Sequence, residues 1–350
     1  MTDITIRGAG IFGLSIAWAC VQRGARVQII DPHGAGAGSS GGIVGALAPH
    51  VPENWNPKKA FQLESLLMAE TFWREVADAG GSDPGYARTG RLQPITDAAA
   101  RTLAQRRTEG ARALWQGQAL WEVITAPDSP WQPHSPEGHL IRDTLSAHLH
   151  PRRACDALVA ALRAHGVDVV PEAADRGGRG DQGGAVLWAT GVAGLEQLNT
   201  THSRSMGGGV KGQAALLQYD AAGLPQLFAG GVHIIPHLDG TVAIGSTSEP
   251  QYDDPATTDA RLDDVIAAAR AAVPALSDAA VIARWAGVRP RARSRAPMLG
   301  PWPGRAGHYI ANGGFKIGFG MAPKVAQVMA TLMLDGHDTI PEGFRVEDNL

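Results

Sequence analysis

The hydrophobic pattern changes period twice near the start of the chain. Residues 4–6 and 27–30 are short runs of β-branched and apolar side chains, which favour strands. Between them, apolar residues recur at the spacing of one helix face: Leu14, Ala17, Trp18 and Val21. Gly24 is placed to end that helix. The pattern therefore predicts a strand, a helix and a second strand.

The rest of the pattern predicts a mixed chain. Helical periodicity covers 61–79, 97–115, 150–165 and 260–272, and a last helix is predicted to start near Pro323 and to end at Gly336. Strands are predicted at 86–95, 167–170, 185–188, 214–218, 232–236, 242–245 and 308–311. Loops are predicted at the proline-rich 126–138 and, as a surface hairpin, at 177–184. The short alternating strands after residue 210 indicate an antiparallel block laid over the first unit.

Three glycines at the first turn carry candidate chemistry. Gly8, Gly10 and Gly13 form the pattern G-x-G-x-x-G, which permits a tight turn, close approach of a pyrophosphate and close packing of helix on strand. Asp31 ends the second strand, where it can accept a hydrogen bond from a ribose hydroxyl. The helix N-terminus favours phosphate. These features predict a dinucleotide site, and the alternative is simple turn chemistry in a chain with 44 glycines.

Glycines and small residues also dominate 32–50. Such a segment leaves backbone N–H groups free to approach a ligand, and it follows a predicted nucleotide-binding strand directly. The alternative is a flexible linker.

Composition narrows the classes of function. The 350 residues carry 31 Lys and Arg against 34 Asp and Glu, a net charge of −3, so nucleic acid is an unlikely partner. Cys20 and Cys155 lie in predicted helices without paired spacing, and we interpret them as reduced packing residues, a disulfide being the lesser alternative. The apolar run 11–21 is too short to cross a bilayer. We expect a cytoplasmic protein of two domains, without membrane insertion or a metal site, and leave its oligomeric state open.

The order of short motifs resembles the FAD-dependent amino acid oxidase family, which includes D-amino acid oxidase, glycine oxidase, sarcosine oxidase and the FAD domain of the bacterial tRNA wobble-uridine modification protein. The resemblance runs nearly from end to end. Besides the first glycine motif and Asp31, it rests on the segments 39–42, 150–152, 189–191, 211–213, 245–249, 287–290 and the late glycine-rich loop 313–320.

This resemblance implies an α/β fold in which a Rossmann-like FAD domain is interleaved with an α+β substrate domain built on an antiparallel sheet. The FAD domain would comprise 1–80, 142–206 and 285–350, and the substrate domain 81–141 and 207–284. It also implies non-covalent FAD, since neither cysteine falls in a motif for covalent attachment.

The motifs and the resemblance together predict a set of cofactor-binding residues. These are Gly8, Gly10, Ile11, Phe12, Gly13, Asp31, Pro32, Ser39, Ser40, Gly41, Gly42, Gly45, Ala46, Leu47, Val170, Ala189, Thr190, Gly191, Arg289, Gly314, Phe315, Lys316, Ile317 and Gly318.

Three residues are candidates for the chemistry. The resemblance assigns Arg289 to the substrate carboxylate, which a guanidinium fork can bind bidentately; a structural ion pair is the alternative. Lys316, in a glycine-rich turn before a helix, could place a positive charge beside the flavin or bind the carboxylate, or could be a solvated loop residue. His233 stands where glycine oxidase has a tyrosine, so it lines the pocket or is structural. Arg291, Arg293 and Arg295 receive no role.

The predicted activity is oxidation of the C–N bond of a small amino or imino acid, with hydride transfer to flavin N5. The alternatives are a tRNA wobble-uridine-modifying flavoenzyme and a non-catalytic flavin-binding scaffold. A nicotinamide enzyme would leave both later glycine-rich segments without a role.

Overall fold

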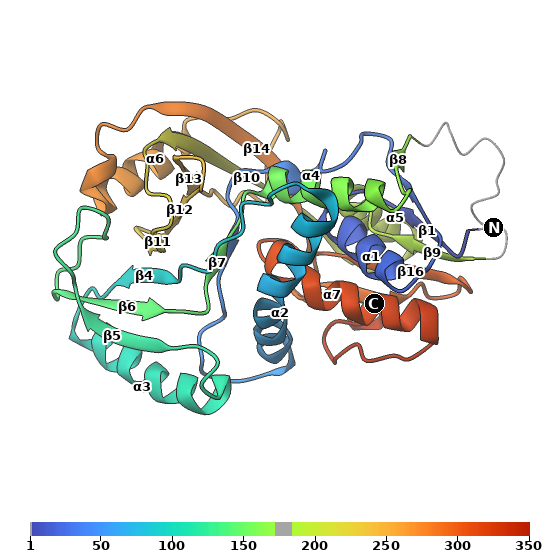
Figure 1. The fold of residues 1–350 in the computed structure, drawn as a ribbon, viewed down its shortest axis with the longest axis horizontal. Coiled ribbons are helices and arrows are strands. Elements are labelled where there is room, and N and C mark those ends of the chain that lie inside the picture. The colour runs from blue at the N-terminus through green and yellow to red at the C-terminus, as the bar shows by residue number, and fades with distance from the viewer. Residues whose placement is uncertain (1, 172–183) are drawn as a thin grey trace.

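Two β-sheets with helices packed on them make up the protein (Figure 1). The structure is a computed structural model that describes residues 2–171 and 184–350. The hairpin predicted at 177–184 falls almost entirely outside these residues.

The first sheet contains the strands predicted to bind the nucleotide. Its order, among the described residues, is β15-β16-β9-β1-β2-β8, parallel except for the edge strand β15. The strands are β1 Ile4–Arg7, β2 Val27–Ile30, β8 Val169–Val170, β9 Ala185–Trp188, β15 Met298–Pro301 and β16 His308–Asn312. Because parallel strands point their carboxyl ends to the same edge, the segments that follow β1, β2, β9 and β16 gather there.

Helices cover both faces of this sheet. The α-helices of the described residues, of which α3 and α6 pack on the second sheet, are α1 Ile11–Gln22, α2 Pro57–Gly80, α3 Ala98–Trp115, α4 Pro151–Ala164, α5 Gly191–Thr201, α6 Arg261–Ala272 and α7 Gly318–Asp335. α1, α2, α4 and α7 pack together in the larger core, which Leu187 of β9 also enters. The adjacent Trp188 faces the smaller core with α5, as alternation along a strand requires.

The second sheet is mainly antiparallel. Within the same part of the chain its order is β14-β10-β13-β12-β11-β4-β6-β5, and only β11 and β4 pair in parallel. Its strands are β4 Arg91–Pro94, β5 Trp121–Thr125, β6 His139–Asp143, β10 Gly207–Gln218, β11 Gln226–Ala229, β12 Val232–Pro236, β13 Thr241–Gly245 and β14 Val281–Ala292. α6 covers one face, and α3 packs against β5.

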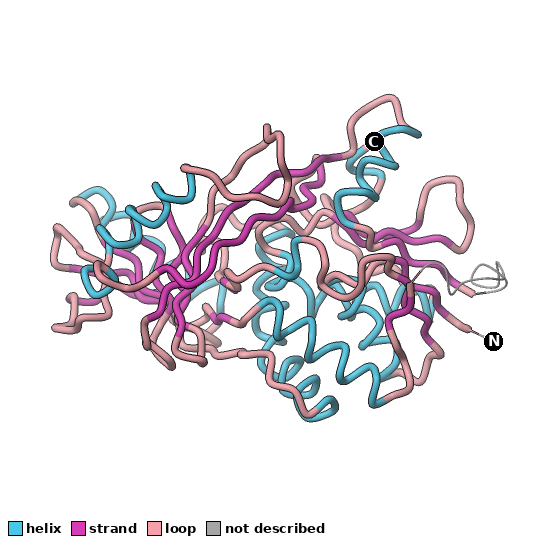
Figure 2. The backbone as a smooth tube through the Cα atoms, turned by 90° about the horizontal axis from the view of Figure 1, so that it is seen from above, coloured by secondary structure: helices cyan, strands magenta, loops and turns pink. Residues whose placement is uncertain are grey.

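Two long strands connect this sheet to the centre of the molecule. β10 and β14 pair over most of their length, and the view from above shows them running inward from the second sheet (Figure 2). A short ladder of β3 (Ala46–Leu47) with β7 (Ala147–His148) lies between the two parts.

The fold class is confirmed, and the predicted strand–helix–strand unit is observed at β1, α1 and β2. α2 starts a turn before the predicted residue 61, because the Asn56 side chain accepts the Lys59 N–H at 3.1 Å and Pro57 occupies the first helical position. α5, β5, β6 and β15 were not predicted; β6, for example, shows no alternation of apolar and polar residues.

The start of the last helix was predicted wrongly. α7 begins at Gly318, not near Pro323, so the late loop is shorter than the predicted 313–320. Proline favours a first helical position, but here the helix continues through it. In the turns ahead of the proline, Gly320 is buried, and its position would allow a Cβ ordinary van der Waals contact with Leu66 and Leu47.

The limits of the two domains stay a prediction. β14 continues through the predicted boundary at residue 285, and β6 through that at 142.

Replacing Gly13 with alanine should destabilise the protein, because a Cβ atom there would lie 1.9 Å from the Gly8 carbonyl oxygen. We expect the free energy of unfolding, measured with urea in the absence of added FAD, to fall by roughly 1–3 kcal/mol, the usual penalty of overpacking. Gly38→Ala is the matched control, since nothing lies within 4 Å of its Cβ position. Equal stability of both variants would contradict the packing argument.

Candidate functional site

Position 8, in the turn after β1, allows only glycine. Gly8 has a φ of 106°, and a Cβ on it would lie 2.3 Å from the Ala189 carbonyl oxygen. Gly8 and Gly13 thus bring three backbone segments together: the ends of β1 and β9 and the first turn of α1. The predicted residues Ala189, Thr190 and Gly191 lie at this crossing.

The N-terminus of α1 opens beside the second glycine-rich segment. Gly10 is the N-cap, and a Cβ on it would lie 3.2 Å from the Ser40 hydroxyl. That hydroxyl accepts the Ile11 N–H at 3.0 Å. Ser39, Ser40 and Gly41 form a 3₁₀ turn there, so both predicted glycine segments border one helix N-terminus, which attracts anions.

Asp31 lies at the end of β2, next to the same turn. Its carboxylate accepts the Ala9 N–H at 2.8 Å and the His33 N–H at 2.9 Å, one on each oxygen. Each oxygen keeps a second acceptor site, so a ribose hydroxyl can still bind. The Asp31 N–H donates to the Val170 carbonyl at 3.0 Å, which brings that predicted residue to the same edge, with Pro32 following.

The second glycine segment does not behave as a flexible linker. A Cβ on Gly42 would touch the Trp285 ring at 3.3 Å, and one on Gly45 would lie 2.0 Å from the Leu149 carbonyl oxygen. Ala46 and Leu47 continue as β3. The segment is packed against both parts of the molecule.

The late loop lies beside the two earlier glycine segments, and together these three segments form the predicted cofactor-binding path. A Cβ on Gly314 would lie 2.8 Å from the Phe12 ring, so the loop touches the first turn of α1. Phe315 has a φ of 46° and donates its N–H to the Pro290 carbonyl at 2.9 Å. Lys316 and Ile317 follow, with Ile317 as the N-cap of α7. The beginning and the end of the chain therefore meet here.

One face of the second sheet looks toward this path. His233, Gly245, Ala214 and Trp285 stand opposite one another on β12, β13, β10 and β14. Residues opposite each other share a face, and so does Arg289, four positions after Trp285. The next row of the sheet packs against α6, and its members are Leu92, Leu227, Ile234, Ile244 and Ala215.

Arg289 is a buried cation. Its guanidinium lies over Gly212, where an added Cβ would be 1.8 Å from one terminal nitrogen. It donates to the Ser246 hydroxyl at 2.6 Å and to the Thr247 carbonyl at 3.4 Å. Burial lowers its pKa to about 10, and among the described residues it forms no ion pair, which disagrees with the structural ion-pair alternative. A buried charge with neutral partners favours an anionic ligand.

Lys316 and His233 lie near this cation. The Lys316 side chain is exposed to solvent. Partial desolvation of its ammonium and then the Arg289 charge lower its pKa, and it forms no ion pair within the described ranges. Burial, Arg91 and Lys316 lower the pKa of His233 to about 4, so its imidazole is neutral at pH 7. The Phe228 ring packs on it, with ring centroids 4.8 Å apart.

Arg91 borders the same face, on β4. It forms a buried ion pair with Asp143, 2.9 Å from Nε to Oδ2. Gln226 pairs with Arg91 and lies two positions before Phe228, which pairs with His233. Arg91 is therefore on the same face of the sheet as His233.

The three arginines without a predicted role have structural contacts. Arg291 lies over the Phe315 ring, 5.7 Å from its centroid, and Arg293 donates to the carbonyls of Asn349 and Leu350. The Arg295 carbonyl accepts a hydrogen bond from Lys58.

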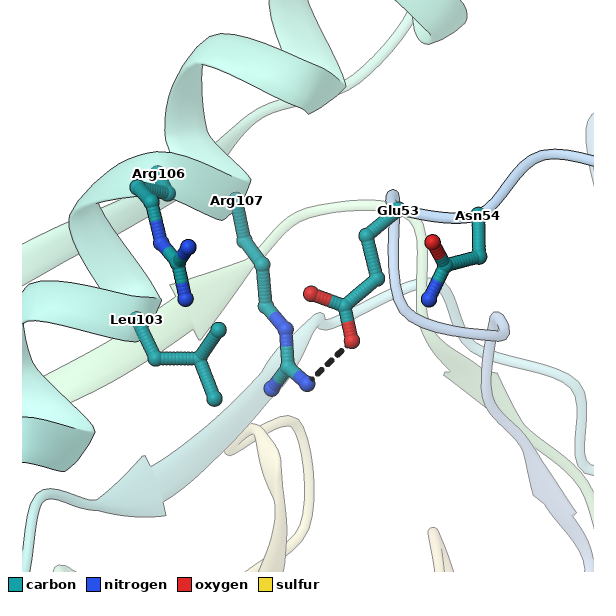
Figure 3. Close-up of a pocket in the computed structure, with 5 residues that line it drawn as sticks. All are labelled: Glu53, Asn54, Leu103, Arg106 and Arg107. Carbon is teal, nitrogen blue, oxygen red and sulfur yellow. Dashed lines mark hydrogen bonds and ion pairs between the residues drawn. The ribbon is translucent and has the colours of Figure 1, made fainter.

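A separate pocket contains none of the predicted site residues. Arg107 and Glu53 pair across it at 2.6 Å, and Figure 3 shows the residues that line it: Glu53, Asn54, Leu103, Arg106 and Arg107.

Sequence reasoning assigned no role to Ser246, Thr247, Glu249 or Trp285. The segment 245–249 entered only as part of the resemblance. The spacing of Trp285, Gly287 and Arg289 by two residues was the available signal, since it places them on one face of a strand.

Among the described residues, no cluster of three His, Cys, Asp or Glu side chains is arranged to hold a metal ion. None of the described helices has the length and hydrophobicity to cross a bilayer. Cys20 and Cys155 are buried and unpaired, and burial raises the pKa of each thiol to about 12.

Comparison with known proteins agrees with this geometry. Residues 3–332 match the family described as FAD dependent oxidoreductase. The chain belongs to this family. It is therefore an FAD-dependent oxidoreductase, as the sequence resemblance predicted.

Several relatives are similar over almost their whole length. Glycine oxidase of Pseudomonas aeruginosa is 27% identical over 350 residues, which cover 94% of each chain. The structure of glycine oxidase from Geobacillus kaustophilus superposes with a TM-score of 0.83 at 20% identity, covering 98% of each chain. That of iminodiacetate oxidase from Chelativorans sp. gives 0.84 at 21% identity, also covering 98% of each.

Three histidines cluster where the two parts of the molecule meet. His150 precedes α4 and His237 follows β12, with ring centroids 4.7 Å apart. His237 Nε2 donates to the Ile43 carbonyl at 2.9 Å, which ties the second glycine segment to β12. His148 of β7 is fully buried, and neither ring nitrogen has a hydrogen-bond partner in the part of the chain that the structure describes.

Acid should therefore destabilise the fold. Burial lowers the pKa of His148, His233 and His237 from 6.5 to about 4. Below pH 6.5 the unfolded chain binds more protons than the folded chain at these sites. The free energy of unfolding therefore decreases as the pH is lowered, by up to ~1.4 kcal/mol per pH unit for each histidine. Urea unfolding between pH 7 and 5, above the range of most carboxylates, measures this slope.

His148→Phe should reduce that slope, because it removes one of the buried titrating groups. An unchanged slope in the variant would show that His148 does not titrate in this way.

Proposed function

We propose that the enzyme oxidises the C–N bond of a small amino or imino acid whose carboxylate binds Arg289. The observation that carries this proposal is the buried guanidinium with only neutral partners, on the sheet face that looks toward the cofactor-binding path. A carboxylate would supply the missing counter-charge and match the planar fork.

The residues present suit FAD. The crossing of Gly8, Gly13 and Ala189 leaves the N-terminus of α1 open for the pyrophosphate, and Asp31 retains acceptor sites for the ribose. The late loop would border the flavin ring. Bound FAD supplies the acceptor for a hydride from the substrate carbon that bears nitrogen.

The chain's own residues orient the substrate. Arg289 binds the carboxylate, and Lys316 adds a second positive charge from the late loop. His233 is neutral at pH 7, so with Phe228 it forms an uncharged wall and leaves the carboxylate to the two cations. The names of the relatives, glycine oxidase and iminodiacetate oxidase, support a small amino or imino acid.

Two alternatives remain distinguishable by experiment. A tRNA-modifying enzyme should bind tRNA in a salt-dependent way, yet the net charge of −3 offers no general basic surface. A flavin-binding scaffold should be indifferent to the loss of Arg289.

Arg289→Ala should abolish productive substrate binding. Glycine, sarcosine, proline and D-amino acids are screened anaerobically for bleaching of the flavin, and with the best substrate we expect KM to rise by ~100-fold or more, because a buried charge-assisted contact is lost. Arg284→Ala is the control, since its ion pair with Asp263 is largely exposed. Bleaching by none of these compounds would argue strongly against the proposal, as would an unchanged KM in the Arg289 variant.

We also expect FAD to be dissociable. Cys20 and Cys155 are fully buried in helices packed in the larger core, so neither thiol is available for a covalent link. Acid precipitation should leave a colourless pellet and a yellow supernatant whose absorbance matches free FAD. Yellow colour retained by the washed precipitate would contradict this.

A further inference from the structure

The segment that holds Arg289 is itself held by a buried network. The Thr247 hydroxyl accepts the Gln213 N–H at 2.8 Å and donates to a carboxylate oxygen of Glu249. The Thr247 N–H donates to the Gln213 carbonyl at 3.2 Å. These bonds clamp Thr247 to β10, and its carbonyl oxygen is one of the two acceptors for Arg289.

Glu249 is the centre of this network. It is 6% exposed, and its backbone pairs with Lys211 through two hydrogen bonds of 2.9 Å. Its carboxylate accepts the Gln213 amide at 3.0 Å and Arg261 at 2.7 Å. Burial alone would raise the pKa of Glu249, but hydrogen bonds from Thr247, Gln213 and Arg261 lower it, so the side chain is ionised at neutral pH.

The Glu249 carboxylate influences Arg289 electrostatically but does not bind its guanidinium directly. Among the described residues, no ion pair joins Glu249 to Arg289, whose hydrogen bonds go to Ser246 and Thr247. The negative charge of Glu249 nevertheless favours the protonated guanidinium and opposes the effect of burial. The rest of the fork is thereby left free for a ligand.

We infer that Glu249 is a positioning residue for substrate binding, which fixes the Arg289 fork through Thr247. This inference rests on the proposed function, because it takes Arg289 as the carboxylate-binding group. The role is separate from catalysis, since Glu249 reaches the site only through its neighbours.

The first experiment removes the hydroxyl of Thr247, which links Glu249 to the segment that holds Arg289. Acetate is titrated into FAD-loaded protein, and its Kd is followed by the change in flavin absorbance. Thr247→Val deletes the hydroxyl at nearly constant volume and should raise Kd about tenfold, while KM rises more than kcat falls. Thr247→Ser keeps the hydroxyl and should restore Kd to within about twofold of the original, as a merely steric role would not.

The second experiment removes the charge. Glu249→Gln keeps the shape but weakens the charge-assisted bond that holds the Thr247 hydroxyl, so it should raise the Kd of acetate at pH 7 by about threefold or more, while KM rises more than kcat falls. Arg284→Ala, whose exposed ion pair goes to Asp263 and not to Glu249, Thr247 or Gln213, should leave the Kd unchanged.

The outcomes separate the two proposals. If Arg289→Ala binds acetate like the original protein, the proposed function fails, and the inference fails with it. If Arg289→Ala loses acetate while Glu249→Gln keeps the original Kd, the proposed function stands and the inference is overturned, even if Thr247→Val does not fold.

Discussion

The arrangement of the site depends on a positive charge that is buried without a carboxylate beside it. Removing a guanidinium from water is unfavourable unless hydrogen bonds and opposite charge compensate. Arg289 receives two neutral acceptors from the end of β13 and a more distant negative charge from Glu249. Gly212 of β10 provides the space for it, while Gly287, opposite on β14, leaves space for the Trp285 ring. A side chain at Gly212 would displace the guanidinium, so the glycine in the strand is explained by the cation and not by the strand.

The late loop connects this cation to the cofactor-binding path. Gly314 touches the first turn of α1, and Phe315 donates to the carbonyl next to Arg289. The same few residues therefore determine how the Arg289 guanidinium, the proposed carboxylate-binding group, stands relative to the turn between β1 and α1. These contacts of the late loop bring segments from opposite ends of the chain into one site, as the discontinuous domains predicted from the sequence require.

The fold could be predicted from the sequence farther than the site could. Local signals were sufficient for β1, α1 and β2, because periodicity and the glycine motif agree there. They misplaced the start of α7, which begins at Gly318 although proline favours a first helical position and Pro323 lies inside the helix. Arg289 was predicted through the resemblance and Lys316 from its glycine-rich turn before a helix, whereas Trp285, Ser246 and Thr247 were not predicted. Their importance depends on which strands pair, and no local pattern reports that β13 delivers Ser246 to an arginine of β14.

Strand register then decides which side chains can enter the site at all. The row of His233, Gly245, Ala214 and Trp285 faces the cofactor-binding path, while the neighbouring row is part of the apolar core under α6. A slip of one residue would exchange the two rows, moving Arg289 into that core and exposing its apolar side chains. The irregularity between β10 and β14 falls at Leu216 and Leu217, beyond these site residues along β10. Hydrophobic burial on one face of the sheet therefore enforces the position of the charged groups on the other.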